Sequence, residues 1–243
     1  MRTGTSYGNE LPRIYELQGL LETRKLSNTY FQDFDNSIAA DRQKLKFLED
    51  IEDDLKDLDD AAWNFLKGEV VPFFQQKDCK RGWQQVFDRL NEAKGYNYLI
   101  KLGCQDVEFI PRSGKDGPKT PDLKGKLNST LVLCEVKTIN ASNDEVERRK
   151  KKIAIVDYQL SLPEPFFKKL EDILKKAKGQ MESCCSETGT RKIVYVVINP
   201  DDLLNIFAER YLEQLEEYKK NSPVQGIEII FDTKPAYNCS AMV

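Results

Sequence analysis

Two carboxylates and a lysine near the middle of the chain have the types and spacing that can hold a divalent cation against a phosphate. Asp122 follows Pro121, and a spacer of twelve residues separates it from Glu135, which Lys137 follows after one further residue. Hard oxygen ligands beside a lysine favour Mg²⁺ or Mn²⁺ over metals that prefer softer ligands. This combination indicates metal-assisted hydrolysis of phosphodiester bonds.

The segment that carries these residues can form a β-hairpin. Asn128 and Ser129 favour a turn, and pairing residue i with residue 257 − i would place Asp122 directly opposite Glu135. Alternation along the second strand predicts that Glu135 and Lys137 share a chemical face, while the intervening residues point to the core on the other face. Opposed carboxylates about 5 Å apart repel each other by about 3 kcal/mol at an effective dielectric of about 20. A shared proton or a bound cation must offset that repulsion.

Periodicity around the hairpin predicts the elements that must position these residues. Apolar residues at spacings of three and four predict helices, and short apolar runs predict strands. The predicted elements are a helix over 83–102, a strand over 106–110, the hairpin, a helix that begins at Pro163 or Pro165, a strand over 193–198, a further helix, and a strand over 227–231. The order is α-β-β-β-α-β, followed by a helix and a strand.

The motif and this order of elements resemble the PD-(D/E)XK nuclease superfamily, over roughly residues 82–200. Pro121, Asp122, Glu135 and Lys137 match its signature of a Pro-Asp, a spacer, an acid, any residue and a lysine. The resemblance implies an α/β protein with a restriction-endonuclease-like αβββαβ core and a mixed central sheet. It also implies that Asp122 and Glu135 bind Mg²⁺, and that Lys137 orients the attacking water or neutralises the phosphate.

Two further residues join the predicted site through this resemblance. Glu92, in the helix before the core, corresponds to an acid that many family members use as a further metal ligand. Gln180 resembles a glutamine that faces the site in many relatives, so it is included among the predicted catalytic residues. The alternatives, a surface glutamate and an exposed amide at a helix end, stay open.

A second stretch carries a similar spacing but lacks the right local structure. Asp201 follows a proline and precedes Glu217 and Lys219 at a permissible distance. The segment from 203 to 218 has a helical period, and residues i and i+2 of a helix do not share a face. We therefore reject this match and keep the hairpin.

Basic residues gather around the hairpin and predict contact with nucleic acid. The segment 111–152 contains eleven Lys and Arg against six Asp and Glu, a net charge of +5. Phosphate backbones require such positive surface, although a solvated loop could have the same composition. The predicted nucleic-acid-binding residues are Arg112, Lys115, Lys119, Lys124, Lys126, Arg148, Arg149 and Lys150.

The N-terminal part of the chain differs from the rest in charge. Residues 1–28 are polar and predicted to form a loop with one helical turn, and 28–66 are predicted to form a long helix or a helical pair. The segment 33–60 has eleven Asp and Glu against four Lys and Arg, a net charge of −7 within a chain of net charge −3. We predict an N-terminal polar segment and acidic helical arm over 1–76 and a nuclease-like domain over 77–243. The arm could pack on the core or form a homodimer.

Composition excludes several other classes of site. The chain contains no histidine, which excludes Ser-His-Asp, Cys-His and histidine-dependent nuclease chemistry. It has no GxxxxGK(S/T) or GxGxxG sequence, so P-loop and Rossmann nucleotide sites are disfavoured. Six cysteines without a CxxC spacing, no signal sequence and no long apolar run predict a cytoplasmic protein that does not enter a membrane.

These observations lead to a metal-dependent nuclease acting on DNA as the expected function, with three alternatives. RNA could be the substrate. The chain could instead be an inactive member of the fold that binds nucleic acid without cutting it. It could also be a protein-interaction module that uses the acidic arm.

Overall fold

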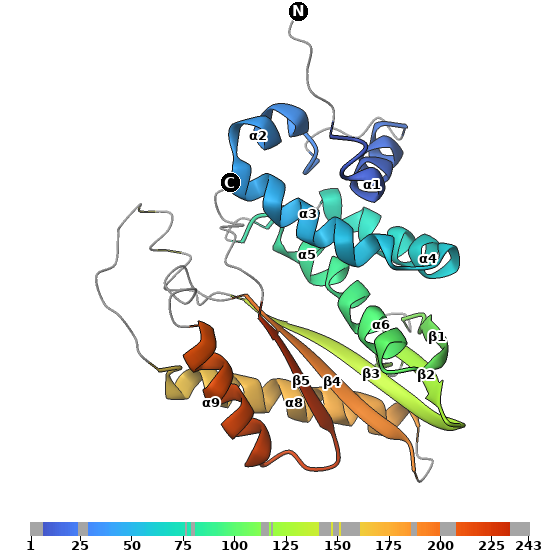
Figure 1. Cartoon of the computed structure of the whole chain (residues 1–243), viewed down its shortest axis with the longest axis vertical. Helices are drawn as coiled ribbons and strands as arrows, with labels where there is room; N and C mark the ends of the chain where they lie inside the picture. The colour runs from blue at the N-terminus through green and yellow to red at the C-terminus, as the bar shows by residue number, and fades with distance from the viewer. Residues whose placement is uncertain are drawn as a thin grey trace, which may run out of the picture. The chain divides into compact units, whose positions relative to one another are not determined.

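The computed structural model describes residues 7–23, 29–75, 77–78, 81–112, 117, 119–140, 147, 151, 161–185, 189–199 and 208–233. Their helices and strands, shown in Figure 1, are α1 (Pro12–Thr23), α2 (Phe34–Ala40), α3 (Arg42–Lys56), α4 (Asp60–Val70), the 3₁₀ helix η1 (Val71–Gln75), α5 (Gln84–Leu90), α6 (Glu92–Lys101), β1 (Gln105–Phe109), β2 (Leu123–Leu127), β3 (Thr130–Ile139), α8 (Glu164–Cys184), β4 (Arg191–Ile198), α9 (Ala208–Lys220) and β5 (Glu228–Thr233).

The described chain forms two compact units. The boundary between them falls between Asn97 and Tyr98, within α6. The first unit is helical, and the second contains the sheet with α8 and α9. The predicted domain boundary after residue 76 stays a prediction. Among the described helices, none combines the length and the apolar character needed to cross a bilayer.

The helical unit contains more helix than the sequence prediction gave it. Residues 12–23, predicted as loop with one helical turn, form the twelve-residue helix α1, whose buried side chains Ile14, Leu17 and Leu21 recur at spacings of three and four. The predicted long helix or helical pair over 28–66 is three helices, α2, α3 and α4. The predicted homodimer and protein-interaction roles of this arm stay predictions.

A buried carboxylate fixes the first turn of α1. Glu52 of α3 is 2% exposed, and its two oxygens accept the backbone N–H groups of Arg13 and Ile14, each at 3.0 Å. Burial raises the pKa of Glu52, and these two hydrogen bonds oppose that rise. The bond pattern satisfies two of the four N–H groups that the start of a helix leaves without an intrahelical partner.

Replacing Glu52 with alanine should lower the free energy of unfolding by about 2 kcal/mol, because two buried N–H groups would lose their acceptor. Urea denaturation followed by circular dichroism measures this loss. Asp53→Ala is the matched control, since Asp53 is an exposed neighbour on the same helix, and it should change stability by less than about 0.5 kcal/mol. Equal effects of the two substitutions would contradict the capping role.

The second unit is built on a five-stranded mixed sheet in the order β1-β2-β3-β4-β5. The first three strands pair antiparallel, while β3, β4 and β5 pair parallel. Parallel neighbours need a crossover connection, and α8 and α9 lie in the two connections (Figure 1). The mixed α/β class and the predicted order of elements are confirmed. The predicted helix over 83–102 is interrupted at Asn91, which ends α5 before α6 begins.

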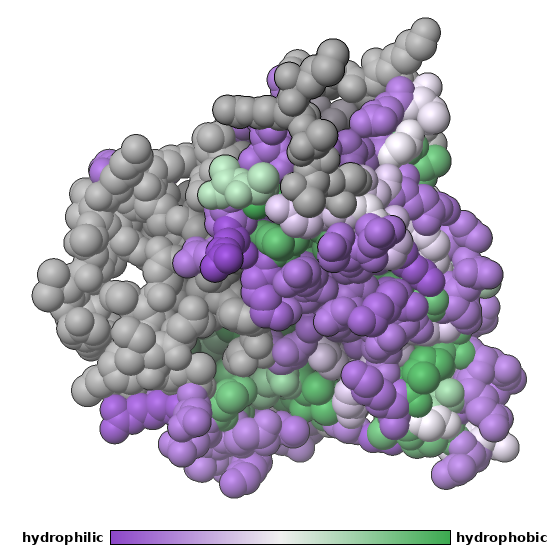
Figure 2. All heavy atoms as spheres, turned by 45° about the horizontal axis from the view of Figure 1, so that its top comes forward, coloured by the Kyte–Doolittle hydropathy of each residue, from purple (hydrophilic) through white to green (hydrophobic). Residues whose placement is uncertain are grey.

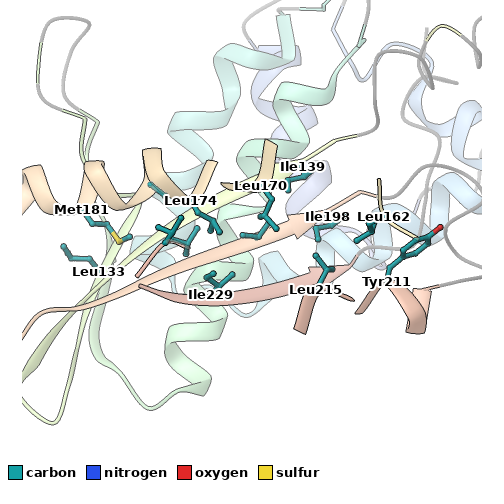
Figure 3. Packing of buried hydrophobic residues seen from close by; sticks show 14 residues of the cluster. Leu133, Ile139, Leu162, Leu170, Leu174, Met181, Ile198, Tyr211, Leu215 and Ile229 are labelled. Atoms are coloured by element: carbon teal, nitrogen blue, oxygen red, sulfur yellow. The ribbon is translucent and has the colours of Figure 1, made fainter. Parts of the chain in front are cut away.

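Helices α8 and α9 cover one face of this sheet. Four α8 side chains at helical spacing, Leu170, Leu174, Ala177 and Met181, are each 0% exposed. Figure 3 shows them meeting residues of the strands and of α9, and the labelled members include Leu133, Ile139, Ile198, Tyr211, Leu215 and Ile229. The helical spacing of apolar residues predicted α8 correctly. The side of α8 that carries these residues packs against the sheet.

Both faces of β3 are buried, which corrects the prediction of one chemical face and one core face. Leu133 and Ile139 share a face with Glu135 and Lys137 by strand alternation, and both belong to the core beneath α8. The opposite face carries Val132, Cys134 and Val136, with exposures of 0%, 0% and 8%, as predicted. The reason is the parallel pairing of β3, because such strands are covered on both sides.

Hydrophilic side chains cover most of the described surface on the face shown in Figure 2. Hydrophobic residues reach that surface in small separate areas. Large exposed apolar side chains in the described chain are limited to Ile100 and Leu212. This face therefore offers charge and hydrogen bonds to a partner rather than a wide apolar patch.

Candidate active site

The predicted hairpin forms in the predicted register. Leu123 pairs with Cys134 and Leu127 with Thr130, so every pair in the ladder sums to 257. Asn128 and Ser129 have φ values of 49° and 68°, the two positive angles that a two-residue type I′ turn requires. Continuing the ladder by one residue places Asp122 opposite Glu135.

Asp122 directly precedes β2 and is held by several hydrogen bonds. It is 9% exposed, and its Oδ2 accepts the backbone N–H of Val136 at 2.9 Å. Arg112 donates to Oδ1 at 3.2 Å from a half-exposed side chain, and the backbone carbonyl of Asp122 accepts the N–H of Ile110 at 2.9 Å. These bonds tie Asp122 to the strands on either side of it and aim its carboxylate at β3.

Glu135 lies in the middle of β3 and is 1% exposed. Its Oε1 accepts a hydrogen bond from Lys137. Its other oxygen, Oε2, is buried and has no donor of ordinary geometry in the described part of the chain. A buried acceptor without a donor is costly, and a bound ion or water is one of the few ways to offset that cost.

The surroundings of Glu135 disturb its ionisation. Burial, the largest cause, and the negative charge of Asp122 together raise the pKa of Glu135 to about 7. The ion pair with Lys137 and the proximity of Gln180 oppose this rise. Near neutral pH the carboxyl group of Glu135 is therefore balanced between protonated and ionised forms, and a cation at Oε2 would favour the ionised form. The hairpin register predicts this electrostatic repulsion between the two carboxylates.

Helix α8 brings Gln180 into contact with this group. Lys137 Nζ donates to Gln180 Oε1 at 3.3 Å, and Gln180 Nε2 donates to the carbonyl of Thr120 at 3.4 Å. The amide therefore links the lysine of β3 to the loop before Asp122. The four predicted catalytic residues therefore lie together, namely Asp122, Glu135, Lys137 and Gln180.

A pocket of about 500 Å³ opens beside Lys137 and Gln180. Three of its lining residues are lysines, and the other four belong to α8. The lining residues are Lys119, Lys137, Ile173, Lys176, Gly179, Gln180 and Ser183. Lys176, Gly179 and Ser183 were not predicted from the sequence. Lys176 and Ser183 lie four and three residues from Gln180, a spacing that places them on the same side of the helix, and Gly179 directly precedes Gln180.

The predicted nucleic-acid-binding residues have different surroundings. Lys124 and Lys126 of β2 form ion pairs with Glu108 at 2.7 Å and Asp106 at 3.1 Å, and their side chains are about half exposed or more. Arg112 pairs with Asp122, and Lys119 lines the pocket. The other four, Lys115, Arg148, Arg149 and Lys150, lie outside the described residues. The role of the whole set stays a prediction.

Glu92 belongs to the helical unit and is buried rather than a surface residue. It is 6% exposed and forms an ion pair with Arg89, which also lies 3.6 Å from Glu69. Its role as a further metal ligand stays a prediction. Across the described ranges, no three or more Asp, Glu, Cys or His side chains form a group that could hold a metal ion.

The rejected second match has the local structure that its period predicted. Glu217 and Lys219 lie within α9, and Tyr218 between them stacks on Phe167 of α8 with ring centroids 5.5 Å apart. Asp201 lies outside the described residues. The acid and the lysine of this match therefore sit on a helix that packs against the core.

No protein-family model, no curated protein and no solved structure matches this chain significantly. The PD-(D/E)XK resemblance therefore depends on the hairpin residues and the order of the elements around them.

Proposed function

We propose that this protein is a metal-dependent nuclease that hydrolyses phosphodiester bonds in DNA. The observation that supports it most strongly is the buried Oε2 of Glu135, which lacks a donor in the described structure and lies beside the carboxylate of Asp122. Two carboxylates with one uncompensated buried oxygen form a fitting site for Mg²⁺ or Mn²⁺. Mg²⁺ commonly takes one or two carboxylates and completes its shell with water and substrate phosphate, so two protein ligands suffice.

Each residue has a distinct task in this proposal. Asp122 and Glu135 would hold the metal, which when bound supplies an activated water and stabilises charge on the phosphate oxygens. Lys137, 27% exposed, would orient that water or neutralise the phosphate, and Gln180 keeps its ammonium group in place through the 3.3 Å hydrogen bond. The bonds from Val136 and Arg112 keep Asp122 aimed at β3 before substrate arrives.

A nucleic-acid-binding protein without cleavage activity is the second candidate. It is favoured by the ion pairs that neutralise both carboxylates, from Arg112 to Asp122 and from Lys137 to Glu135. In a nuclease, the side chains of Arg112 and Lys137 must give up some of their contacts with the carboxylates when the metal binds. In a binding protein they would simply stay in place.

Incubation of labelled single- and double-stranded DNA and RNA with Mg²⁺, Mn²⁺ or EDTA tests the proposal. Cleavage should require the metal, and Asp122→Asn should reduce its rate by at least about 100-fold, because one ligand loses its charge while the acceptor for Val136 is kept. Asp106→Asn is the control, since Asp106 is an exposed carboxylate on β1. Cleavage in EDTA, or unchanged cleavage by Asp122→Asn, would reject the site. Binding without cleavage would support the second candidate, and preference for RNA would correct the substrate.

A further inference from the structure

The pocket beside Lys137 has the composition of an anion site. Its volume of about 500 Å³ lies in the range that encloses ligands of about the size of a nucleotide. Its described lining contains three lysines and no carboxylate. The apolar side chain of Ile173 and the hydroxyl of Ser183 complete it, so it offers charge, a hydrogen-bonding group and one apolar wall.

Two of these lysines differ from their neighbours in being uncompensated. Within the described structure, neither Lys119 nor Lys176 forms an ion pair, and both are exposed. By contrast, Lys175 pairs with Glu171 at 2.5 Å and Lys178 lies 3.7 Å from Glu182, each on the same helix. Of the three lysines at 175, 176 and 178, Lys176 therefore lacks a carboxylate partner, and it lines the pocket.

Gly179 keeps the helix backbone open at this point. It lies within the 21-residue helix α8, and a Cβ atom built on it would meet nothing within 4 Å. Glycine is among the poorest helix formers, and packing here does not require it. The absence of a side chain leaves the floor of the pocket accessible to a ligand.

We propose that this pocket binds a phosphate group of the nucleic-acid strand, with Lys119 and Lys176 as its contacts. The inference rests on the proposed function, because it takes nucleic acid as the ligand. Lys137 and Gln180 line the pocket, and Lys137 also contacts Glu135, so the bound phosphate is a neighbour of the one that is cleaved. The bound group is either a phosphodiester within the strand or a phosphate at its end. Lys119 and Lys176 are then positioning residues for the substrate.

Fluorescence anisotropy with short single- and double-stranded oligonucleotides in EDTA tests this site without cleavage. Lys119→Glu and Lys176→Glu should each weaken binding at least tenfold and reduce the slope of log affinity against log salt by about one, as expected for loss of one phosphate contact. Lys175→Glu is the matched control, since it makes the same change of charge on the same helix at a lysine that already has a carboxylate partner. It should change affinity by less than about threefold. Equal losses in all three variants would overturn the proposal.

Oligonucleotides with a 5′-phosphate, a 3′-phosphate or no terminal phosphate distinguish the two sources of the bound group. A loss confined to one phosphorylated end assigns a terminal phosphate to the pocket. An equal loss with all three assigns a phosphodiester within the strand. Either result supports the site.

Gly179→Leu supplies a test that leaves charge unchanged. The leucine should raise Tm, because it improves helix propensity, and should weaken binding at least tenfold by filling the pocket. Gly68→Leu in α4 is the control, since Gly68 is also exposed within a helix and has no atom near its Cβ position. It should raise Tm and leave binding unchanged. Wild-type affinity in Gly179→Leu would contradict the pocket.

The failure of this inference and the failure of the proposed nuclease give different results. Metal-dependent cleavage with wild-type binding by the pocket variants would overturn the pocket and keep the nuclease. Specific loss of binding in those variants without any cleavage would keep the pocket and reject the nuclease. Absence of oligonucleotide binding by the wild type would reject both.

Discussion

Replacement of Glu135 by glutamine should reduce metal-dependent cleavage by at least about 1000-fold while the protein stays folded. Glutamine has nearly the same shape and can still accept the hydrogen bond from Lys137. It cannot supply the negative charge that would hold a divalent cation at the buried Oε2 position. Metal binding and the stabilisation of phosphate charge would be lost together, which is the reason for the large effect.

Single-turnover cleavage at saturating Mg²⁺ measures this loss, and circular dichroism verifies the fold. Glu108→Gln is the matched control, because Glu108 is an exposed carboxylate on β1, two strands away from β3, and this substitution should leave the rate unchanged. Binding of oligonucleotide in EDTA should also stay near the wild-type value in Glu135→Gln. Cleavage within tenfold of wild type by this variant would remove Glu135 from the active site.

The hairpin could be predicted from sequence because its determinants are local. Turn-forming residues at Asn128 and Ser129 fix the register, and one register is enough to place Asp122 opposite Glu135. The same is true of α8, whose apolar residues at Leu170 and Leu174 mark the side that contacts the sheet.

The features that the sequence did not predict depend on contacts between distant segments. The start of helix α1 is capped by Glu52, which lies 38 and 39 residues away along the chain from the two N–H groups that it accepts. The pocket combines Lys119 from a loop with Lys176 from a helix, and no spacing relates the two. The burial of Glu135 follows from the parallel pairing of β3 and from α8 above it, neither of which the hairpin motif contains.

The burial of Glu135 should also make the stability of the metal-free protein depend on pH. In the folded protein the pKa of Glu135 is raised to about 7 from 4.5, and a shift of that size corresponds to about 3 kcal/mol. Between these two pH values the unfolded chain has lost the proton and the folded chain has kept it. The contribution of Glu135 to stability must therefore fall as pH rises from about 4.5 to about 7, and it then stays constant.

Urea denaturation in EDTA at a series of pH values isolates this effect when wild type is compared with Glu135→Gln. The two proteins should be about equally stable near pH 4, and the variant should be more stable by about 3 kcal/mol at pH 8, because glutamine has no charge to bury.

Saturating Mg²⁺ should stabilise the wild type and not the variant, and it should do so more at pH 8 than at pH 5, since the cation binds the ionised carboxylate. A stability difference that does not change with pH would show that Glu135 ionises normally.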